Sequence, residues 1–309
     1  MVLLGNEQAI SRLEKSLASG RVGHGYLFTG AEGTGKRTLA RWFAKAILCT
    51  GEHPPCGKCA ACQKMERFSH PDYKEYLGED RARSFPVETV RQIRQDCAIL
   101  PNEGKKKIYC LSNVQSMTTE GMNAFLKTLE EPPAHSIFLL LCPSATQLPE
   151  TVRSRLVQIA LQPLSATQVE QLLAQHQPDA DPNLRHWASL LSDGSLGLAM
   201  KLVQEPEFGT RAQLAKNICQ SLVRRREYPL AQALAGLEKD GEGFLQVLQL
   251  TQRLLRIQLE QSDSPLPQKQ EIRVLELLEQ ARLRLSGNAH KGLTGAWLTI
   301  QLMEAVSAP

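Results

Sequence analysis

A glycine-rich loop near the N-terminus constrains the fold of this 309-residue chain more than any other feature. Gly30-Ala31-Glu32-Gly33-Thr34-Gly35-Lys36 has the spacing G-x-x-x-x-G-K, follows an apolar run at 25–28 and precedes a helical pattern. In this strand–loop–helix context, backbone N–H groups approach phosphate oxygens and the lysine reaches the β- and γ-phosphates. The context disfavours a glycine-rich turn with an incidental lysine. The candidate phosphate-loop residues are Gly30, Gly33, Thr34, Gly35, Lys36 and Thr38.

The first 163 residues alternate apolar runs with helical patterns. Strands are predicted at 25–28, 108–111, 137–141 and 157–161, with a weaker fifth at 72–77. Continuous apolar strands that alternate with helices are typical of a parallel sheet covered on both faces. We therefore predict an α/β domain over residues 1–163.

The remainder of the chain has only helical patterns. It opens with a capping box formed by Ser165 and Gln168. Breaks at Asp193-Gly194-Ser195 and Glu205-Pro206 divide it into a small helical unit at 164–206 and a larger one at 207–309.

Composition excludes several classes of protein. The chain has 42% hydrophobic residues, and its 36 basic and 32 acidic side chains give a net charge of +4. This excludes disordered and collagen-like chains, and the charge gives only a mild basic bias. The basic runs 105–107 and 224–226 are typical of solvated faces. No run reaches the ~20 apolar residues of a membrane helix, and the first 20 residues lack a signal-peptide pattern, so we expect a cytoplasmic protein without membrane contact.

The phosphate loop lacks the residues that usually accompany ATP hydrolysis. Arg37 occupies the position where a Ser or Thr hydroxyl normally holds Mg²⁺. Thr38 cannot take over, because one helical step rotates a side chain by about 100°. The run at 107–111 ends in Ser112-Asn113, although a phosphoryl-transfer site needs acidic groups there. The sequence therefore predicts weak or absent ATP binding and no ATP hydrolysis by this chain alone.

Four cysteines form a second candidate site. Cys49, Cys56, Cys59 and Cys62 have the pattern C-x6-C-x2-C-x2-C in a polar loop with His53. Four thiolates suit a structural, tetrahedral Zn²⁺ with no open position, whereas an iron–sulfur cluster or free thiols fit less well. Four isolated cysteines are predicted to be small core residues: Cys97, Cys110, Cys142 and Cys219.

The motifs together resemble those of bacterial clamp-loader subunits. They are the phosphate loop, the four-cysteine module, the run from Asn123 to Pro133 (NAFLKTLEEPP) and Arg153-Ser154-Arg155. The resemblance covers about the first 200 residues. It implies an AAA+ α/β domain with a zinc insertion at 49–62, a helical lid at 164–206 and a helical collar for oligomerisation at 207–309.

In its departures from these motifs, the chain resembles the non-hydrolysing member of that family. Besides Arg37 and Ser112-Asn113, the segment 193–197 has glycine where ATP-hydrolysing members place a sensor arginine. The resemblance implies that Arg155 is an arginine finger acting in trans, on ATP held by a neighbouring subunit.

The implied partners are the tau/gamma and delta subunits and, through the complex, the beta sliding clamp and primed DNA. The chain would then be a component of the DNA polymerase III holoenzyme without ATPase activity of its own. Two alternatives remain: an ATP-hydrolysing tau/gamma-type subunit, and a zinc-stabilised DNA-binding module unrelated to clamp loading.

Overall fold

The computed structural model describes residues 5–77, 85, 87–204, 206–260 and 266–307. The chain divides into two compact units, which we describe separately. The first contains Met1–Leu172 with Gly194–Gly197, and the second contains Leu173–Asp193 with Leu198–Pro309. Compactness does not identify a lid or a collar, so the functional boundaries at 163 and 206 remain predictions.

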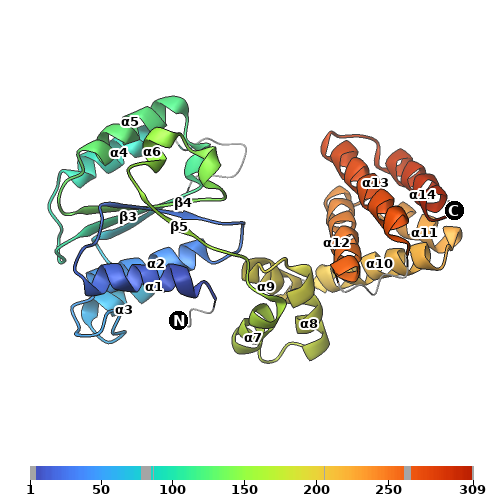
Figure 1. The fold of residues 1–309 in the computed structure, drawn as a ribbon, viewed down its shortest axis with the longest axis horizontal. Coiled ribbons are helices and arrows are strands. Elements are labelled where there is room, and N and C mark those ends of the chain that lie inside the picture. Colours follow the sequence, from blue (N-terminus) through green and yellow to red (C-terminus); the bar gives the residue numbers. More distant parts are fainter. Residues whose placement is uncertain (1–4, 78–84, 86, 205, 261–265, 308–309) are drawn as a thin grey trace. The chain divides into compact units, whose positions relative to one another are not determined.

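A five-stranded parallel sheet forms the centre of the first unit (Figure 1). Its strand order is β2-β3-β4-β1-β5. The strands are β1 (Gly25–Thr29), β2 (Tyr73–Leu77), β3 (Lys107–Ser112), β4 (Ser136–Cys142) and β5 (Val157–Ala160). All five predicted strands are confirmed, including the weaker one.

Helices cover both faces of the sheet, as Figure 1 shows. One face carries α1 (Glu7–Ala18), α2 (Lys36–Leu48) and α3 (Ala60–Glu66), and the other carries α4 (Val87–Cys97), α5 (Thr119–Glu130) and α6 (Glu150–Arg153). Successive strand residues point to opposite faces, so each strand supplies two cores. On β1, for example, Leu27 packs with Phe125 of α5, whereas Phe28 packs with Phe43 of α2.

Buried polar groups in the first unit are held by specific partners. Asp72, just before β2, is fully buried and accepts backbone hydrogen bonds from 102–104. The prediction of a solvated run at 105–107 is wrong for Lys107, which is 2% exposed and lies 3.2 Å from the Asp96 carboxylate. The four isolated cysteines are buried, which confirms their prediction as core residues.

The predicted capping box is present at the start of α7 (Ala166–His176). Gln168 N donates to Ser165 Oγ at 3.2 Å, and Ser165 N donates to Gln168 Oε1 at 3.0 Å. The helices that follow are α8 (Pro182–Leu191), α9 (Leu196–Gln204), α10 (Pro206–Val223), α11 (Glu227–Ala235), α12 (Gly241–Glu260), α13 (Gln268–Ser286) and α14 (Lys291–Ser307). The predicted break at Glu205-Pro206 coincides with the start of α10, and Glu205 itself lies outside the described residues.

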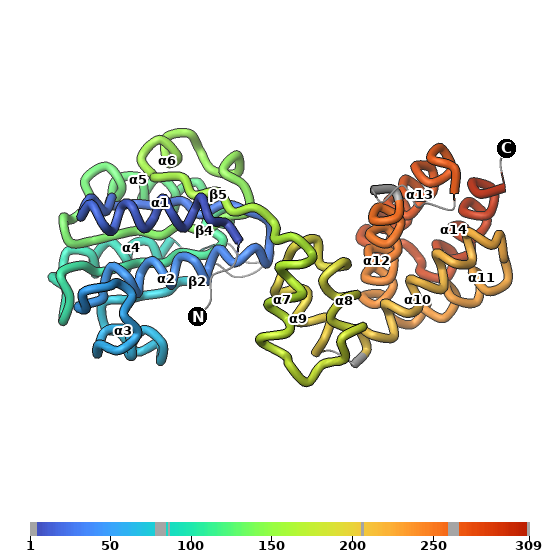
Figure 2. The backbone as a smooth tube through the Cα atoms, turned by 60° about the horizontal axis from the view of Figure 1, so that its bottom comes forward, coloured from blue at the N-terminus to red at the C-terminus, as the bar shows by residue number. Residues whose placement is uncertain are grey.

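Helices α10 to α14 form a bundle in the second unit (Figure 2). Helix α12 packs on α10 and α13, and α14 packs on α13 and α11. Among the described residues, no helix combines the length and the apolar character needed to cross a membrane.

Candidate functional site

The phosphate loop lies where the sequence predicts it, between β1 and α2. Its glycines allow the required backbone: Gly33 and Gly35 have φ angles of 78° and 88°, a region that a side chain disfavours. Thr34 is buried and its hydroxyl donates to Ala31 O at 2.8 Å. The predicted strand–loop–helix arrangement is therefore confirmed.

Lys36 contacts the loop itself. Its Nζ donates to Gly30 O at 2.7 Å and to Ala31 O at 2.8 Å. Burial lowers the pKa of this ammonium group, because the charged form loses contact with water. The cation that would attract a nucleotide phosphate thus satisfies two carbonyl groups of its own loop.

Arg37 is held by a carboxylate that the sequence analysis missed. Glu75 of β2 accepts a hydrogen bond from Arg37 Nε, and its other oxygen accepts from Arg41 Nη2 at 2.6 Å. The Glu75 side chain is 13% exposed, and Arg37 and Arg41 are successive residues on one face of α2. A guanidinium with a protein carboxylate therefore occupies the helix position that normally supplies a metal ligand. The sequence held one indication of this pairing: Glu75 is a charged residue inside the predicted strand at 72–77.

The other candidate residues for hydrolysis do not replace the missing groups. Thr38 is exposed on α2. Ser112 ends β3, its buried Oγ has no hydrogen-bond partner within the described residues, and Asn113 begins the next turn with a φ of 58°. Neither is a carboxylate, so the end of β3 offers no general base.

A segment far along the chain packs on the phosphate loop. Gly33 lies so close to Ser195 that a Cβ at Gly33 would lie 2.8 Å from the Ser195 Cβ and would collide with its hydroxyl. Gly197 lies on the same side, where its own Cβ position would be 3.7 Å from Gly33 Cα. Ser195 and Gly197 belong to the first unit, and Ser195 is 8% exposed. Residues 195–197 thus cover Gly33, a contact that no local sequence pattern predicts.

Arg155 lies in the turn between α6 and β5, on the other side of the sheet. Its Nη1 donates to Thr151 O at 2.7 Å, and its Nη2 donates to Glu130 Oε1 at 2.8 Å. The side chain of Arg155 is 35% exposed and that of Glu130 is 48% exposed. The guanidinium is therefore fixed at two points and still accessible. Glu130, the last residue of α5, was not among the predicted site residues.

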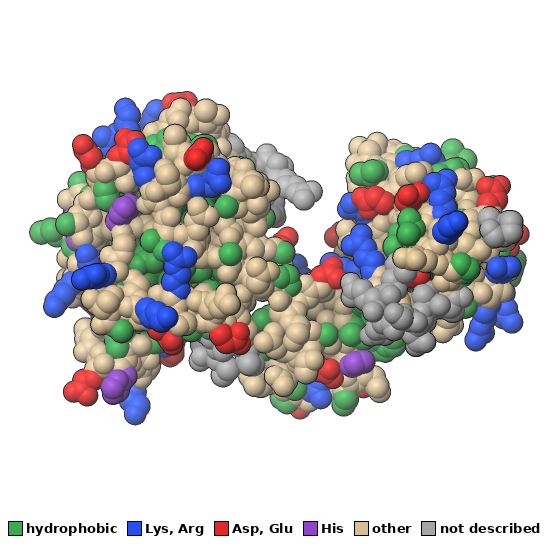
Figure 3. Space-filling view, in the orientation of Figure 1, with side chains coloured by type: hydrophobic (Ala, Val, Ile, Leu, Met, Phe, Trp, Pro, Cys, Tyr) green, Lys and Arg blue, Asp and Glu red, His purple; other side chains and the backbone are tan. Residues whose placement is uncertain are grey.

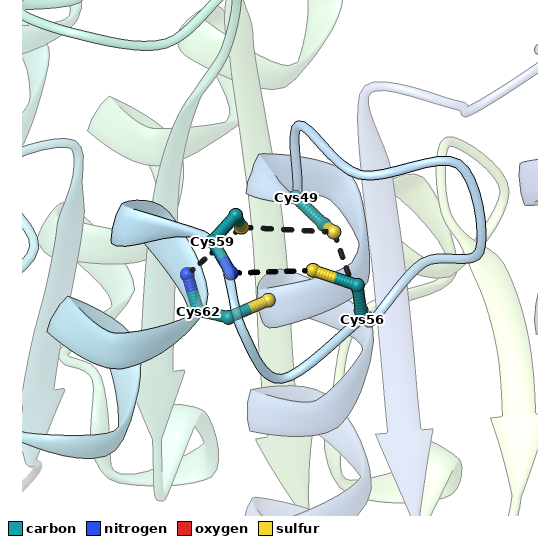
Figure 4. A group of neighbouring side chains, drawn as sticks. All are labelled: Cys49, Cys56, Cys59 and Cys62. Atoms are coloured by element: carbon teal, nitrogen blue, oxygen red, sulfur yellow. Dashed lines mark hydrogen bonds between the residues drawn. The ribbon is translucent and has the colours of Figure 1, made fainter.

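The four predicted cysteines lie together where α2 ends and α3 begins, with their sulfur atoms directed at one another (Figure 4). The sulfur atoms of Cys49, Cys56, Cys59 and Cys62 lie within 4.8 Å of one another, and Cys49 Sγ and Cys59 Sγ are 3.9 Å apart. Two ligands of a tetrahedral Zn–S site are about 3.8 Å apart when each bond is about 2.3 Å. The spacing fits a four-coordinate metal ion.

The electrostatics of the cysteine cluster shift two of its thiols toward ionisation. Burial opposes ionisation, but hydrogen bonds that include backbone N–H groups lower the pKa of Cys59 to about 5 and also lower that of Cys56. Burial raises the pKa of Cys62 to about 12. A cation among the four sulfur atoms would favour the thiolate at every position, because metal ligation requires the deprotonated form. The cluster can therefore hold a metal ion.

The strand order, with a phosphate loop after β1, defines an AAA+ type of P-loop fold. A solved DNA polymerase III gamma subunit-related protein from Thermotoga maritima shares this fold with a TM-score of 0.54 and 18% identity, covering 97% of this chain and 99% of that one. A family model described as DNA polymerase III, delta subunit, matches residues 5–165. The chain belongs to this family.

Two curated relatives refine the comparison. DNA polymerase III subunit tau of Salmonella typhimurium is 35% identical over 209 residues, which are 66% of this chain and 32% of tau. DNA polymerase III subunit delta' of Bacillus subtilis is 31% identical over 208 residues, which are 66% of this chain and 61% of that protein. This chain thus spans about a third of the length of the tau subunit it resembles.

Proposed function

We propose that this chain is the non-hydrolysing delta prime subunit, or stator, of the DNA polymerase III clamp loader. It supplies Arg155 to the ATP site of a neighbouring tau/gamma subunit and helps to load the beta sliding clamp onto primed DNA. Membership of the DNA polymerase III delta subunit family supports this proposal.

One observation carries the proposal: Arg37 stands at the position of the magnesium ligand and pairs with Glu75. A permanent cation repels Mg²⁺, and each function lost with the metal or the base is typically worth orders of magnitude in rate. Lys36 bonded to its own loop and Ser195 packed on Gly33 also argue against a nucleotide in this pocket.

Arg155 has the chemistry that its proposed role requires. A guanidinium stays charged at any physiological pH and presents several donors in one plane, so it stabilises the charge that develops on a transferred γ-phosphate. Its position in an accessible turn, away from this chain's own phosphate loop, supports action on another subunit's nucleotide.

We assign the metal of the cysteine cluster as a structural Zn²⁺. Cys49, Cys56, Cys59 and Cys62 would hold it with four sulfur ligands, a closed set that leaves no position for substrate. The ion would cross-link the end of α2 to the start of α3.

The second candidate is an ATP-hydrolysing tau/gamma-type subunit. The 35% identity to tau favours it, since this exceeds the 31% identity to the delta' relative. Arg37 and Ser112-Asn113 argue against it. A DNA-binding module unrelated to clamp loading is disfavoured by the net charge of +4 and by the mixture of basic and acidic side chains on the face drawn in Figure 3.

Two measurements test the proposal. The purified chain should hydrolyse ATP at the background rate, and brisk turnover would instead establish the tau/gamma-type function. In a complex reconstituted with tau/gamma and delta, Arg155→Ala should lower DNA-stimulated ATP hydrolysis and clamp loading while assembly stays intact. We expect at least a ~10-fold loss of turnover at the affected site.

Arg91→Ala is the matched control. Arg91 is an exposed arginine of the same unit that pairs with Glu120 at 3.5 Å, as Arg155 pairs with Glu130. Arg91→Ala should leave the rates of ATP hydrolysis and of clamp loading unchanged. Equal rates for the Arg155→Ala and wild-type complexes would remove Arg155 from the mechanism.

A further inference from the structure

The contact between Glu130 and Arg155 joins two elements that are far apart in sequence. Glu130 ends α5, Arg155 follows α6, and α5 and α6 pack together. The Arg155 guanidinium is therefore positioned by one side chain and one backbone carbonyl group, at 2.8 Å and 2.7 Å. Both contacts lie within the first unit and need no partner.

The geometry points to Glu130 as a positioning residue for Arg155: it holds the guanidinium in place before the neighbouring subunit's nucleoside triphosphate arrives. This inference rests on the proposed function of Arg155 and adds to it a residue that does not touch the nucleotide.

Arg155 has enough N–H donors to bind a phosphate without releasing Glu130. A guanidinium has five N–H donors, and among the described residues the contacts to Thr151 and Glu130 use two of them, one on each Nη atom, leaving three. The remaining donors lie on the same rigid plane, and 35% of the side chain is accessible. Arg155 can therefore keep both contacts while it binds a phosphate.

Prior positioning lowers the cost of the reaction. A free arginine side chain samples many rotamers, and fixing it during the reaction costs conformational entropy. Donors that already point at the developing charge need no reorganisation at that moment. Glu130 supplies this fixation in the folded chain, before assembly.

The nearby carboxylate also has an opposing effect, because it offsets part of the positive charge of Arg155. The two effects predict opposite results for removal of Glu130. If orientation dominates, the neighbour's ATP turnover falls; if Glu130 mainly holds Arg155 away from the nucleotide, turnover rises. We assign the first, because the unused donors leave Arg155 able to bind without breaking the pair.

The test uses the reconstituted complex with five variants of this chain, one of which is Arg155→Ala. Glu130→Ala should lower kcat for DNA-stimulated ATP hydrolysis about two- to fivefold, the range for a partly exposed ion pair, with little change in KM for ATP. Glu130→Gln keeps an oxygen that can accept from Nη2, so it should restore most of kcat. Glu131→Ala is the matched control, since the adjacent Glu131 makes no ion pair among the described residues. The double variant Glu130→Ala/Arg155→Ala should match Arg155→Ala alone, because Glu130 acts through Arg155.

The outcomes separate this inference from the function on which it rests. An unchanged rate in Arg155→Ala would overturn the proposed role of Arg155. A loss in Arg155→Ala together with an unchanged or higher kcat in Glu130→Ala would overturn only the positioning role. A similar loss in Glu130→Gln and Glu130→Ala would also overturn it. The stability of each variant, from unfolding curves, and its yield of complex should equal those of wild type. A lower stability or a lower yield that accounts for the loss of rate would count against the inference.

Discussion

At the scale of single residues, the phosphate loop is stabilised by contacts from side chains of its own unit. Lys36 donates to two loop carbonyl groups, and Ser195 fills the space over Gly33. These contacts hold the loop in its conformation within the chain itself. Substitution of its glycines should therefore lower the free energy of unfolding of the isolated chain.

Gly33 and Gly35 provide a matched pair of substitutions. Both have positive φ angles, so Ala at either position should cost about 1 kcal/mol in backbone strain. Only Gly33 has a close neighbour; nothing lies within 4 Å of a Cβ at Gly35. Gly33→Ala should therefore destabilise by a further ~1–3 kcal/mol, measured by urea denaturation.

Ser195→Gly in the Gly33→Ala background should recover most of that extra loss, because it removes the side chain that the new methyl group meets. Equal destabilisation by Gly33→Ala and Gly35→Ala would mean that Ser195 does not pack on the loop in solution.

At the scale of helices and strands, the cysteine module connects two helices of one sheet face. Cys49 follows α2, Cys62 lies within α3, and these helices pack together. A metal ion held by four sulfur atoms would fix the polar segment between them, which has little apolar surface to bury.

Metal analysis tests this element directly. We expect about one Zn²⁺ per chain in the wild type and less than a tenth of that in Cys59→Ser, because a closed site tolerates the loss of a thiolate poorly. Chelation should lower the thermal unfolding midpoint of the wild type. Cys97→Ala, which changes a buried cysteine outside the cluster, should keep its zinc. A metal-free wild type whose stability is insensitive to chelators would exclude the zinc assignment.

Elements were more predictable from the sequence than the contacts between them. Each strand and the capping box at Ser165 depend on residues a few positions apart, which hydrophobic periodicity and capping chemistry describe well. The pairs Arg37–Glu75 and Glu130–Arg155 join residues 38 and 25 positions apart. Such pairs depend on the strand order and on side-chain rotamers. Neither can be derived from a single amino-acid sequence.

Burial of charged residues was hard to predict for the same reason. Lys107 has two lysines before it and reads as part of a basic surface, yet it begins β3 and pairs with Asp96 of α4. The four cysteines were predictable as a group because their spacing is local and a polar loop gives thiols no other reason to cluster.

At the scale of the whole molecule, α14 has apolar side chains on both its buried and its exposed sides. It buries Leu298, Leu302 and Val306, yet it also exposes Leu293 by 71% and Ile300 by 54%. A helix that is apolar on both sides normally lies inside a larger structure. This agrees with the predicted role of residues 207–309 in oligomerisation.

Substitutions on the exposed side of α14 test that role. Leu293→Glu and Ile300→Glu should leave the free energy of unfolding of the single chain within about 0.5 kcal/mol, because both side chains already face solvent. They should lower the yield of complex with tau/gamma and delta, measured by gel filtration. Leu100→Glu, at a position that is 72% exposed in the first unit, is the control and should assemble normally. Normal assembly of both α14 variants would contradict the assignment of a collar to this unit.

The pairing of Arg37 and Arg41 with Glu75 distinguishes this loop from one that works with a diffusible ion. A tethered guanidinium does not exchange with solvent, so the local charge is independent of how much free magnesium the cell contains. If the proposed function holds, this charge also stays unchanged while adjacent subunits bind, hydrolyse and release their nucleotides. In the proposed clamp loader, such a pocket would keep one electrostatic state throughout the loading cycle and would give its moving neighbours a fixed point of reference.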